Sequence, residues 1–195
     1  MRGPALAHIA MVALPLHALA AWLCGLASPG YSHREHPLAL LGATGAPEAA
    51  WFNAFGFVLP GLLAALAMWR ERATMPADAG WPRRIAARLG MLGGIAFAGQ
   101  GVFPLDPADI GAPANALHAL AWTLWWIATA ASAVAFARAA PTSRMRRASF
   151  AIAILVPAFA LVHWAGALAA VAPRASFLVW LAWAAALPRL NRDAA

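Results

Sequence analysis

The sequence predicts an all-α integral membrane protein with six transmembrane helices in one bundle and both termini in the cytoplasm. Three observations predict this fold class. The 195 residues are 63% hydrophobic and only 11% charged, with a mean hydropathy of +0.68. Several apolar runs approach the ~20 residues that a helix needs to cross the hydrocarbon core of a bilayer. The arginines, finally, are concentrated in alternate connecting segments.

The composition argues against a soluble domain, because too few charged residues are available to cover its surface. Helices are the expected spanning element, since backbone polar groups must be bonded internally in lipid and the alternation typical of a membrane barrel is absent. A net charge of +7 and a pI near 11.6 would suggest nucleic acid for a soluble protein. Here the charge is better explained by membrane topology, and no nucleic-acid partner is predicted.

The predicted spans belong to a single domain of residues 1–195. They run roughly over residues 5–27, 51–69, 86–103, 115–137, 149–171 and 175–190. The first resembles a secretory signal, with Ala18, Leu19 and Ala20 as a small-residue cleavage site. Because its apolar run continues through Trp22 and Leu26, we expect an uncleaved first helix.

The arginine distribution predicts the orientation. Twelve of the fourteen arginines lie at the N-terminus, at the C-terminus or in the second and fourth connections, and the positive-inside rule places these segments in the cytoplasm. Only Arg34 and Arg174 fall on the other side. Residues 31–50 then form the first outside loop. We expect a multi-pass protein of the bacterial inner membrane.

The third span carries small residues at four-residue spacing. Gly90, Gly94 and Ala98 provide a smooth face where a neighbouring helix can approach closely, either within the bundle or in a homo-oligomer. Pro60 and Pro157 lie inside spans and are expected to kink them, since each removes a backbone hydrogen bond.

Polar side chains concentrate in the half of the protein that faces outward. Ionisable groups at membrane depth are costly and are functional candidates by default, although a neutral histidine can simply bond a neighbouring carbonyl. We expect an outward-facing polar pocket and hypothesise that the segment "SHREH" forms a lid bonded to Asp106, Asp109 or His118. The candidate ligand-binding residues are His33, Arg34, Glu35, His36, Asn53, Gln100, Asp106, Asp109, His118 and His163.

Several short motifs carry a family resemblance. They are His36-Pro37-Leu38, Leu41-Gly42-Ala43, Gly45-Ala46-Pro47, Phe52-Asn53, Phe103-Pro104, Asp106 and His118. With them, nearly the whole chain resembles the bacterial six-helix membrane family catalogued as domain of unknown function 998. This chain has Ala39 where that pattern often has serine, so a hydroxyl role at this position is in doubt. The resemblance implies the fold and topology, and it suggests that the two outside loops and the start of the fourth span form one feature.

Three classes of function follow from these residues. The first is binding of a lipid or small amphiphile, as in a transporter or sensor. The second is a metal-dependent hydrolase acting on a lipid, although no HExxH-type motif is present. The third is a b-haem protein that uses His17 and His163, which lie at similar depths. A helix-packing scaffold is the remaining alternative. The sequence leaves enzymatic activity, metal content and cofactor content open.

Overall fold

A computed structural model describes residues 9–161 and 167–192, and these residues form helices and no strand. The long helices are α1 (Ile9–Ala27), α3 (Leu59–Ala73), α4 (Trp81–Val102), α5 (Pro113–Arg138), α6 (Ser143–Leu161) and α7 (Ala167–Arg192). Three short elements precede α3: the 3-10 helix η2 (Leu38–Gly42), α2 (Ala49–Phe52) and the π-helical segment η3 (Asn53–Val58). Because α2, η3 and α3 are continuous, the described chain contains six long helices.

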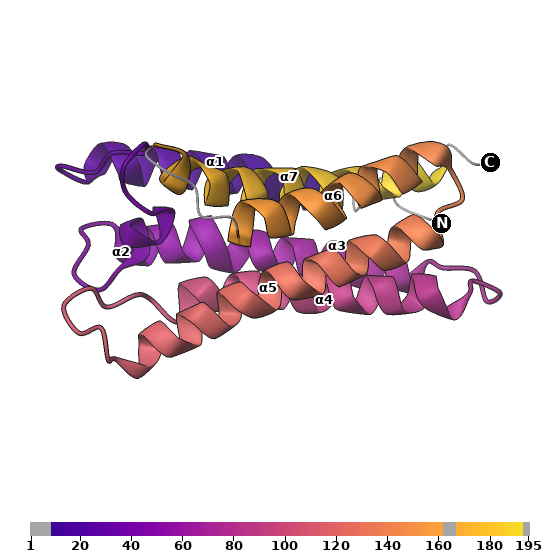
Figure 1. Cartoon of the computed structure of the whole chain (residues 1–195), viewed down its shortest axis with the longest axis horizontal. Coiled ribbons are helices and arrows are strands. Elements are labelled where there is room, and N and C mark those ends of the chain that lie inside the picture. Colours follow the sequence, from indigo (N-terminus) through magenta and orange to yellow (C-terminus); the bar gives the residue numbers. More distant parts are fainter. Residues whose placement is uncertain (1–8, 162–166, 193–195) are drawn as a thin grey trace.

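The helices lie roughly side by side along one axis (Figure 1). From α3 to α7, each helix packs against the next in the chain, and α1 packs against both α3 and α7. One end of the bundle carries η2, α2 and the connections 28–48 and 103–112; we call it the loop end. The opposite end carries the connections 74–80 and 139–142 and is called the arginine end.

Four helices are long and apolar enough to cross a membrane. They cover Ala49–Ala73, Trp81–Val102, Pro113–Arg138 and Leu168–Leu190. The apolar described part of α1, Met11–Ala27, is shorter, and α6 begins with a basic turn. Each predicted span therefore overlaps a helix within the described residues, while length and apolar composition support four helices as membrane spans.

One predicted boundary is wrong. The sequence placed a connection at residues 172–174, but these residues lie inside α7, and α6 ends at Leu161 within the described chain. The predicted spans ended at residue 171 and began again at residue 175, with Arg174 between them on the outer side. Instead, the helix continues through it, and the Arg174 side chain folds back to donate Nη1–H to the carbonyl of Ala170.

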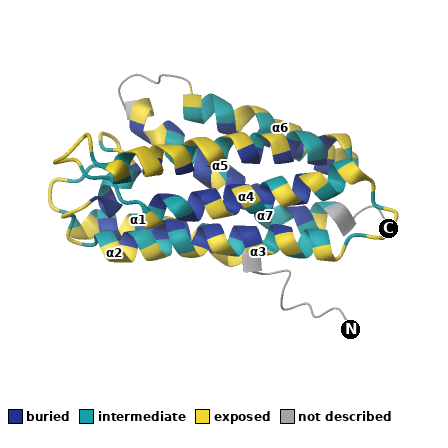
Figure 2. Cartoon of the chain, turned by 90° about the horizontal axis from the view of Figure 1, so that it is seen from below, coloured by how far each residue is buried: buried dark blue, intermediate teal, exposed yellow. Residues whose placement is uncertain are grey.

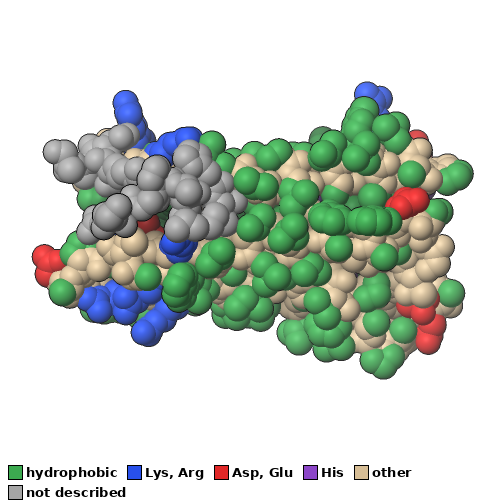
Figure 3. Space-filling view, turned by 180° about the vertical axis from the view of Figure 1, so that it is seen from behind, with side chains coloured by type: hydrophobic (Ala, Val, Ile, Leu, Met, Phe, Trp, Pro, Cys, Tyr) green, Lys and Arg blue, Asp and Glu red, His purple; other side chains and the backbone are tan. Residues whose placement is uncertain are grey.

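The outer surface of the bundle is largely apolar along its middle. Large hydrophobic side chains on every long helix are exposed, and they cover the central part of the space-filling view (Figure 3). Arginine side chains gather mainly at the arginine end. In Figure 2 the buried residues follow the inner faces of the helices. This distribution of an apolar belt with polar ends is typical of proteins that sit in a bilayer.

Glycines allow α3 and α4 to approach each other closely. A Cβ added to Gly94 would lie 2.6 Å from the backbone nitrogen of Ala65, and one added to Gly61 would lie 2.6 Å from that of Ala98. Gly90, Gly94 and Ala98 are buried within the chain. The small-residue face therefore serves packing inside the bundle, and a homo-oligomer stays a prediction.

Candidate ligand pocket between α1 and α7

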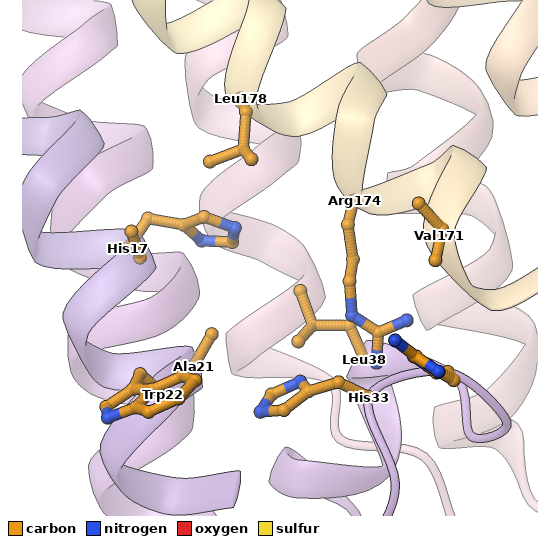
Figure 4. A pocket seen from close by; sticks show the side chains of 10 residues that line it. His17, Ala21, Trp22, His33, Leu38, Val171, Arg174 and Leu178 are labelled. Carbon is orange, nitrogen blue, oxygen red and sulfur yellow. The ribbon is translucent and has the colours of Figure 1, made fainter.

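A cavity of about 320 Å³ opens near the loop end, between α1 and α7. Figure 4 shows His17 reaching from α1, His33 from the first connection and Arg174 from α7 toward a common space. The polar lining is His17, His33, Arg34 and Arg174. The apolar lining is Ala18, Ala21, Trp22, Leu38, Val171 and Leu178. Its volume lies at the lower end of the range for small-molecule sites.

The position of His17 follows from a proline on the neighbouring helix. Pro60 has no N–H, so it cannot donate the helical bond to the carbonyl of Gly56, four residues earlier. His17 Nδ1 lies 2.6 Å from that carbonyl oxygen and donates to it. The His17 ring is only 2% exposed and packs against Phe57, Phe97 and Phe177. Its first role is therefore structural, and the neutral ring keeps Nε2 as an acceptor.

His33 is held between two aromatic rings at the mouth of the cavity. Its ring stacks on Trp22, with an interplanar angle of 4°, and meets the edge of Tyr31 at a centroid distance of 5.0 Å. Gly25 makes room for it, because a Cβ there would lie 2.4 Å from His33 Nε2. Burial, and then the nearby charge of Arg174, lower the pKa of His33 below its ordinary value.

Arg174 provides the cationic end of the cavity. Its Nη2 donates to the hydroxyl oxygen of Tyr31 at 2.5 Å and to the carbonyl of His36 at 2.8 Å. Its Nη1 donates to the carbonyl of Ala170. Its Nε–H is shielded from solvent and has no partner among the described residues. All three bonded oxygens are neutral, so no carboxylate compensates this guanidinium in the described part of the chain.

The acidic residues of the second outside connection are used locally. Asp106 Oδ1 accepts the N–H groups of Ala108 and Asp109, and Asp109 Oδ1 accepts that of Gly111. Asn115 fastens the connection from α5, because its Nδ2 donates to the carbonyls of Asp106 and Asp109 and its Oδ1 accepts from the N–H of Asp106. These bonds build turns of residues 104–112 and lie outside the cavity lining.

His118 caps the end of α4. Its Nδ1 lies 3.0 Å from the carbonyl oxygen of Gln100 and 2.9 Å from that of Phe103. The residues four positions further on are Pro104 and Pro107, which have no N–H to donate. His118 therefore bonds carbonyls that the chain itself leaves without a helical partner.

The remaining predicted site residues that the structure describes do not line the cavity. Asn53 Nδ2 donates to the carbonyl of Gly42 at 2.8 Å. Gln100 is 1% exposed, and its Nε2 has no partner among the described residues. His36 Nδ1 accepts the N–H of Ser32. Glu35 is exposed. His163 lies outside the described residues.

The lid hypothesis is wrong in its predicted contacts. Within residues 9–161 and 167–192, no hydrogen bond or ion pair joins the side chains of His33, Arg34 or His36 to Asp106, Asp109 or His118. The two outside connections do meet, but through the backbone: Thr44 N–H donates to the carbonyl of Leu105 at 2.8 Å. Of the predicted site residues that the structure describes, only His33 and Arg34 line the cavity.

Sequence reasoning missed Arg174 as a site residue, together with its partner Tyr31 and the pocket aromatic Trp22. Arg174 stood out as one of two arginines on the outer side, and that was the available signal. The described residues contain no group of three or more histidine, cysteine, aspartate or glutamate side chains that could hold a metal ion. The proposed haem pair of His17 and His163 involves a residue outside the described chain.

The helical fold, the exposed apolar belt and the spanning-length helices define a protein of the multi-pass membrane class. A family model described as "Protein of unknown function (DUF998)" matches residues 11–189. This match covers most of the chain, which belongs to that family, as its outer motifs predicted. No curated protein and no solved structure matches the chain. The family carries no assigned activity, so function must be argued from the cavity.

Proposed function

We propose that this protein crosses the membrane six times, with both termini on the cytoplasmic side, and binds a lipid or small amphiphile in the cavity between α1 and α7. The bacterial inner membrane is the proposed location. The observation that carries the binding function is a cavity with a continuous apolar wall and cationic groups at one side. An amphiphile offers both kinds of surface, whereas a purely polar solute would leave the apolar wall without a partner.

The membrane placement rests on helix length and on charge. α1 and α6 have 19 residues each in the described chain. At 1.5 Å per residue this gives about 28 Å, close to the ~30 Å of hydrocarbon. The arginine end carries the second and fourth connections and their flanking arginines, and the positive-inside rule assigns it to the cytoplasm. The cavity then faces the outer half of the bilayer.

Orientation can be tested by labelling single cysteines in a variant in which alanine replaces Cys24. Ala108 lies at the loop end and Ala77 at the arginine end, and both are exposed. Ala108→Cys should react with a membrane-impermeant thiol reagent added to intact cells, and Ala77→Cys should react only after the cells are lysed. Labelling of the second position from outside would reverse the orientation.

Amphiphile binding can be tested by filling the cavity. Ala21 lines it and is half-buried, so Ala21→Leu places extra volume inside without adding charge. Ala131→Leu adds the same atoms at an exposed position of α5 and serves as the matched control. Native mass spectrometry in a neutral detergent should show saturable binding of a single-chain amphiphile to the wild type and the control. Ala21→Leu should bind at least about tenfold more weakly, because overpacking a site excludes its ligand. Equal binding by all three proteins would exclude this cavity as the site.

A further inference from the structure

We infer that the amphiphile carries an anionic head group, a carboxylate or a phosphate, and that Arg174 recognises it. This inference rests on the proposed binding function and specifies its ligand class. The unusual feature is a guanidinium in the wall of an apolar cavity with neutral oxygens as its only bonded partners among the described residues. Arg174 is half-buried. A partly desolvated cation without an acidic partner favours an anionic ligand, which would provide that partner.

The guanidinium keeps hydrogen-bonding capacity for such a ligand. Arginine has five N–H donors in a fixed plane. Three of the N–H groups of Arg174 are directed to Ala170, Tyr31 and His36, which hold the plane in one orientation. Besides the shielded Nε–H, one N–H of Nη1 is left without a bonded partner among the described residues, so an oxyanion can be bound by a group that is already oriented.

The surroundings of Arg174 favour an anion over a cation or a neutral group. Arg34 is the second arginine in the lining, and the described lining residues include no aspartate or glutamate. The hydroxyl oxygen of Tyr31 accepts from Arg174, so the hydroxyl hydrogen of Tyr31 remains able to donate to a neighbouring oxygen. The acidic side chains of the second connection do not compete, because they bond their own turns.

The geometry also orients the chain of the ligand. Arg174 and Arg34 lie toward the loop end, while Ala18, Ala21 and Leu178 provide apolar wall on α1 and α7. Small side chains on α1 leave room for an acyl chain between these helices. The head group then lies at the level of the first connection, and the chain runs toward the middle of the bilayer, in the direction that membrane lipids already adopt.

The test compares ligands that differ only in head-group charge. Dodecanoate and dodecan-1-ol share a chain, as do phosphatidylglycerol and phosphatidylcholine with identical acyl groups. Inorganic phosphate is the free anion without a chain. Binding is measured by native mass spectrometry to the wild type, Arg174→Gln, Arg174→Lys and Arg138→Gln. Arg138 lies in the last turn of α5 at the arginine end, so its substitution makes the same change in net charge far from the cavity.

We expect the wild type and Arg138→Gln to prefer an anionic ligand over its neutral or zwitterionic counterpart by at least about tenfold, as loss of a charge-assisted hydrogen bond would produce. Arg174→Gln should abolish this preference while keeping the weaker binding of dodecan-1-ol, and Arg174→Lys should keep part of it. Preference for dodecanoate alone would identify a fatty acid, and preference for phosphatidylglycerol alone would identify a phospholipid; both support the inference.

Three outcomes overturn the inference. If charged and neutral ligands bind equally and Ala21→Leu blocks both, the binding function stands and the anionic class is wrong. If inorganic phosphate displaces dodecanoate fully, the site recognises a free anion rather than an amphiphile. If no ligand binds any variant, the proposed function fails with it. If Arg174→Gln does not fold, Tyr31→Phe and Arg34→Gln are measured in its place. A preference for anionic ligands that is unchanged in both variants also counts against the inference.

Discussion

On two sides of the bundle a histidine bonds a backbone carbonyl near a proline, but the cavity between α1 and α7 lies on only one of these sides. On the α4–α5 side, His118 bonds carbonyls left without a helical partner by Pro104 and Pro107. On the α1–α7 side, His17 bonds the carbonyl of Gly56, which lies four residues before Pro60. The first side is closed and its polar groups are mostly paired locally. The second side encloses a cavity with a cation that has no acidic partner among the described residues. A buried histidine alone therefore does not indicate a site in this protein, and our proposed site rests on the cation beside the cavity.

The largest expected effect concerns the contact between α3 and α4, which lies outside the cavity lining. Gly94→Val forces side-chain atoms into the backbone of α3, where a Cβ alone would already lie 2.6 Å from Ala65 N. Because backbone cannot move aside as a side chain can, we expect a loss of about 3 kcal/mol or more, or no folded protein. Unfolding by SDS in mixed micelles measures it.

Gly25→Ala is a smaller substitution on the α1–α7 side, beside the cavity. There the added Cβ meets the His33 ring, which can move, so the expected loss of stability is about 1 kcal/mol or less. The binding of dodecanoate should change more than the stability does. If the two substitutions destabilise equally, the contrast between a closed and an adaptable side is wrong.

A second prediction concerns His17 and Pro60. His17→Ala leaves the Gly56 carbonyl without its side-chain donor, and we expect a loss of about 1–3 kcal/mol. In that background Pro60→Ala supplies a backbone N–H at the correct position, so the double variant should recover about 1 kcal/mol of the loss. Additive effects of the two substitutions would show that the proline does not determine the role of His17.

A third, smaller effect tests the second outside connection, residues 103–112, at the α4–α5 side. Asn115→Ala removes the bonds to Asp106, Asp109 and Ile110, and we expect a loss of about 1–2 kcal/mol because these bonds are partly exposed. Asn115→Asp keeps the acceptor but turns a carboxylate oxygen toward these three carbonyls, so its loss should be at least as large. Amphiphile binding should be unchanged in both, since Asn115 lies outside the cavity lining. If the Asn115 variants also bind the amphiphile more weakly, the second connection influences the cavity and the two sides are not independent.

Much of the fold could be predicted from the sequence, because apolar runs of spanning length determine where helices form. The segment around Arg174 could not, since proline followed by arginine reads as a turn and only the packed helix shows that it continues. Because Arg174 was placed in a connection between spans, it was not predicted as a residue of the cavity. Asp106 and Asp109 were grouped with the histidines by depth alone. Depth cannot show that Asx-type turns already use their carboxylates.

The smallest predicted effect is a change in the pKa of His33. Burial lowers this pKa from its ordinary value of 6.5, and the charge of Arg174 lowers it further. Arg174→Gln removes the second cause, so the pKa of His33 should rise toward the ordinary value, whereas Arg138→Gln should leave it unchanged. NMR titration of the imidazole resonances measures the difference.

Since the folded state binds this proton less well than the unfolded state, the stability contributed by neutral His33 is present above pH 6.5 and is lost as the pH falls through the lowered pKa. The loss should be smaller in Arg174→Gln, and a bound anion should reduce it in the wild type, because a negative charge beside His33 favours its protonated form. An identical pH dependence in both proteins would mean that Arg174 and His33 do not share one electrostatic environment.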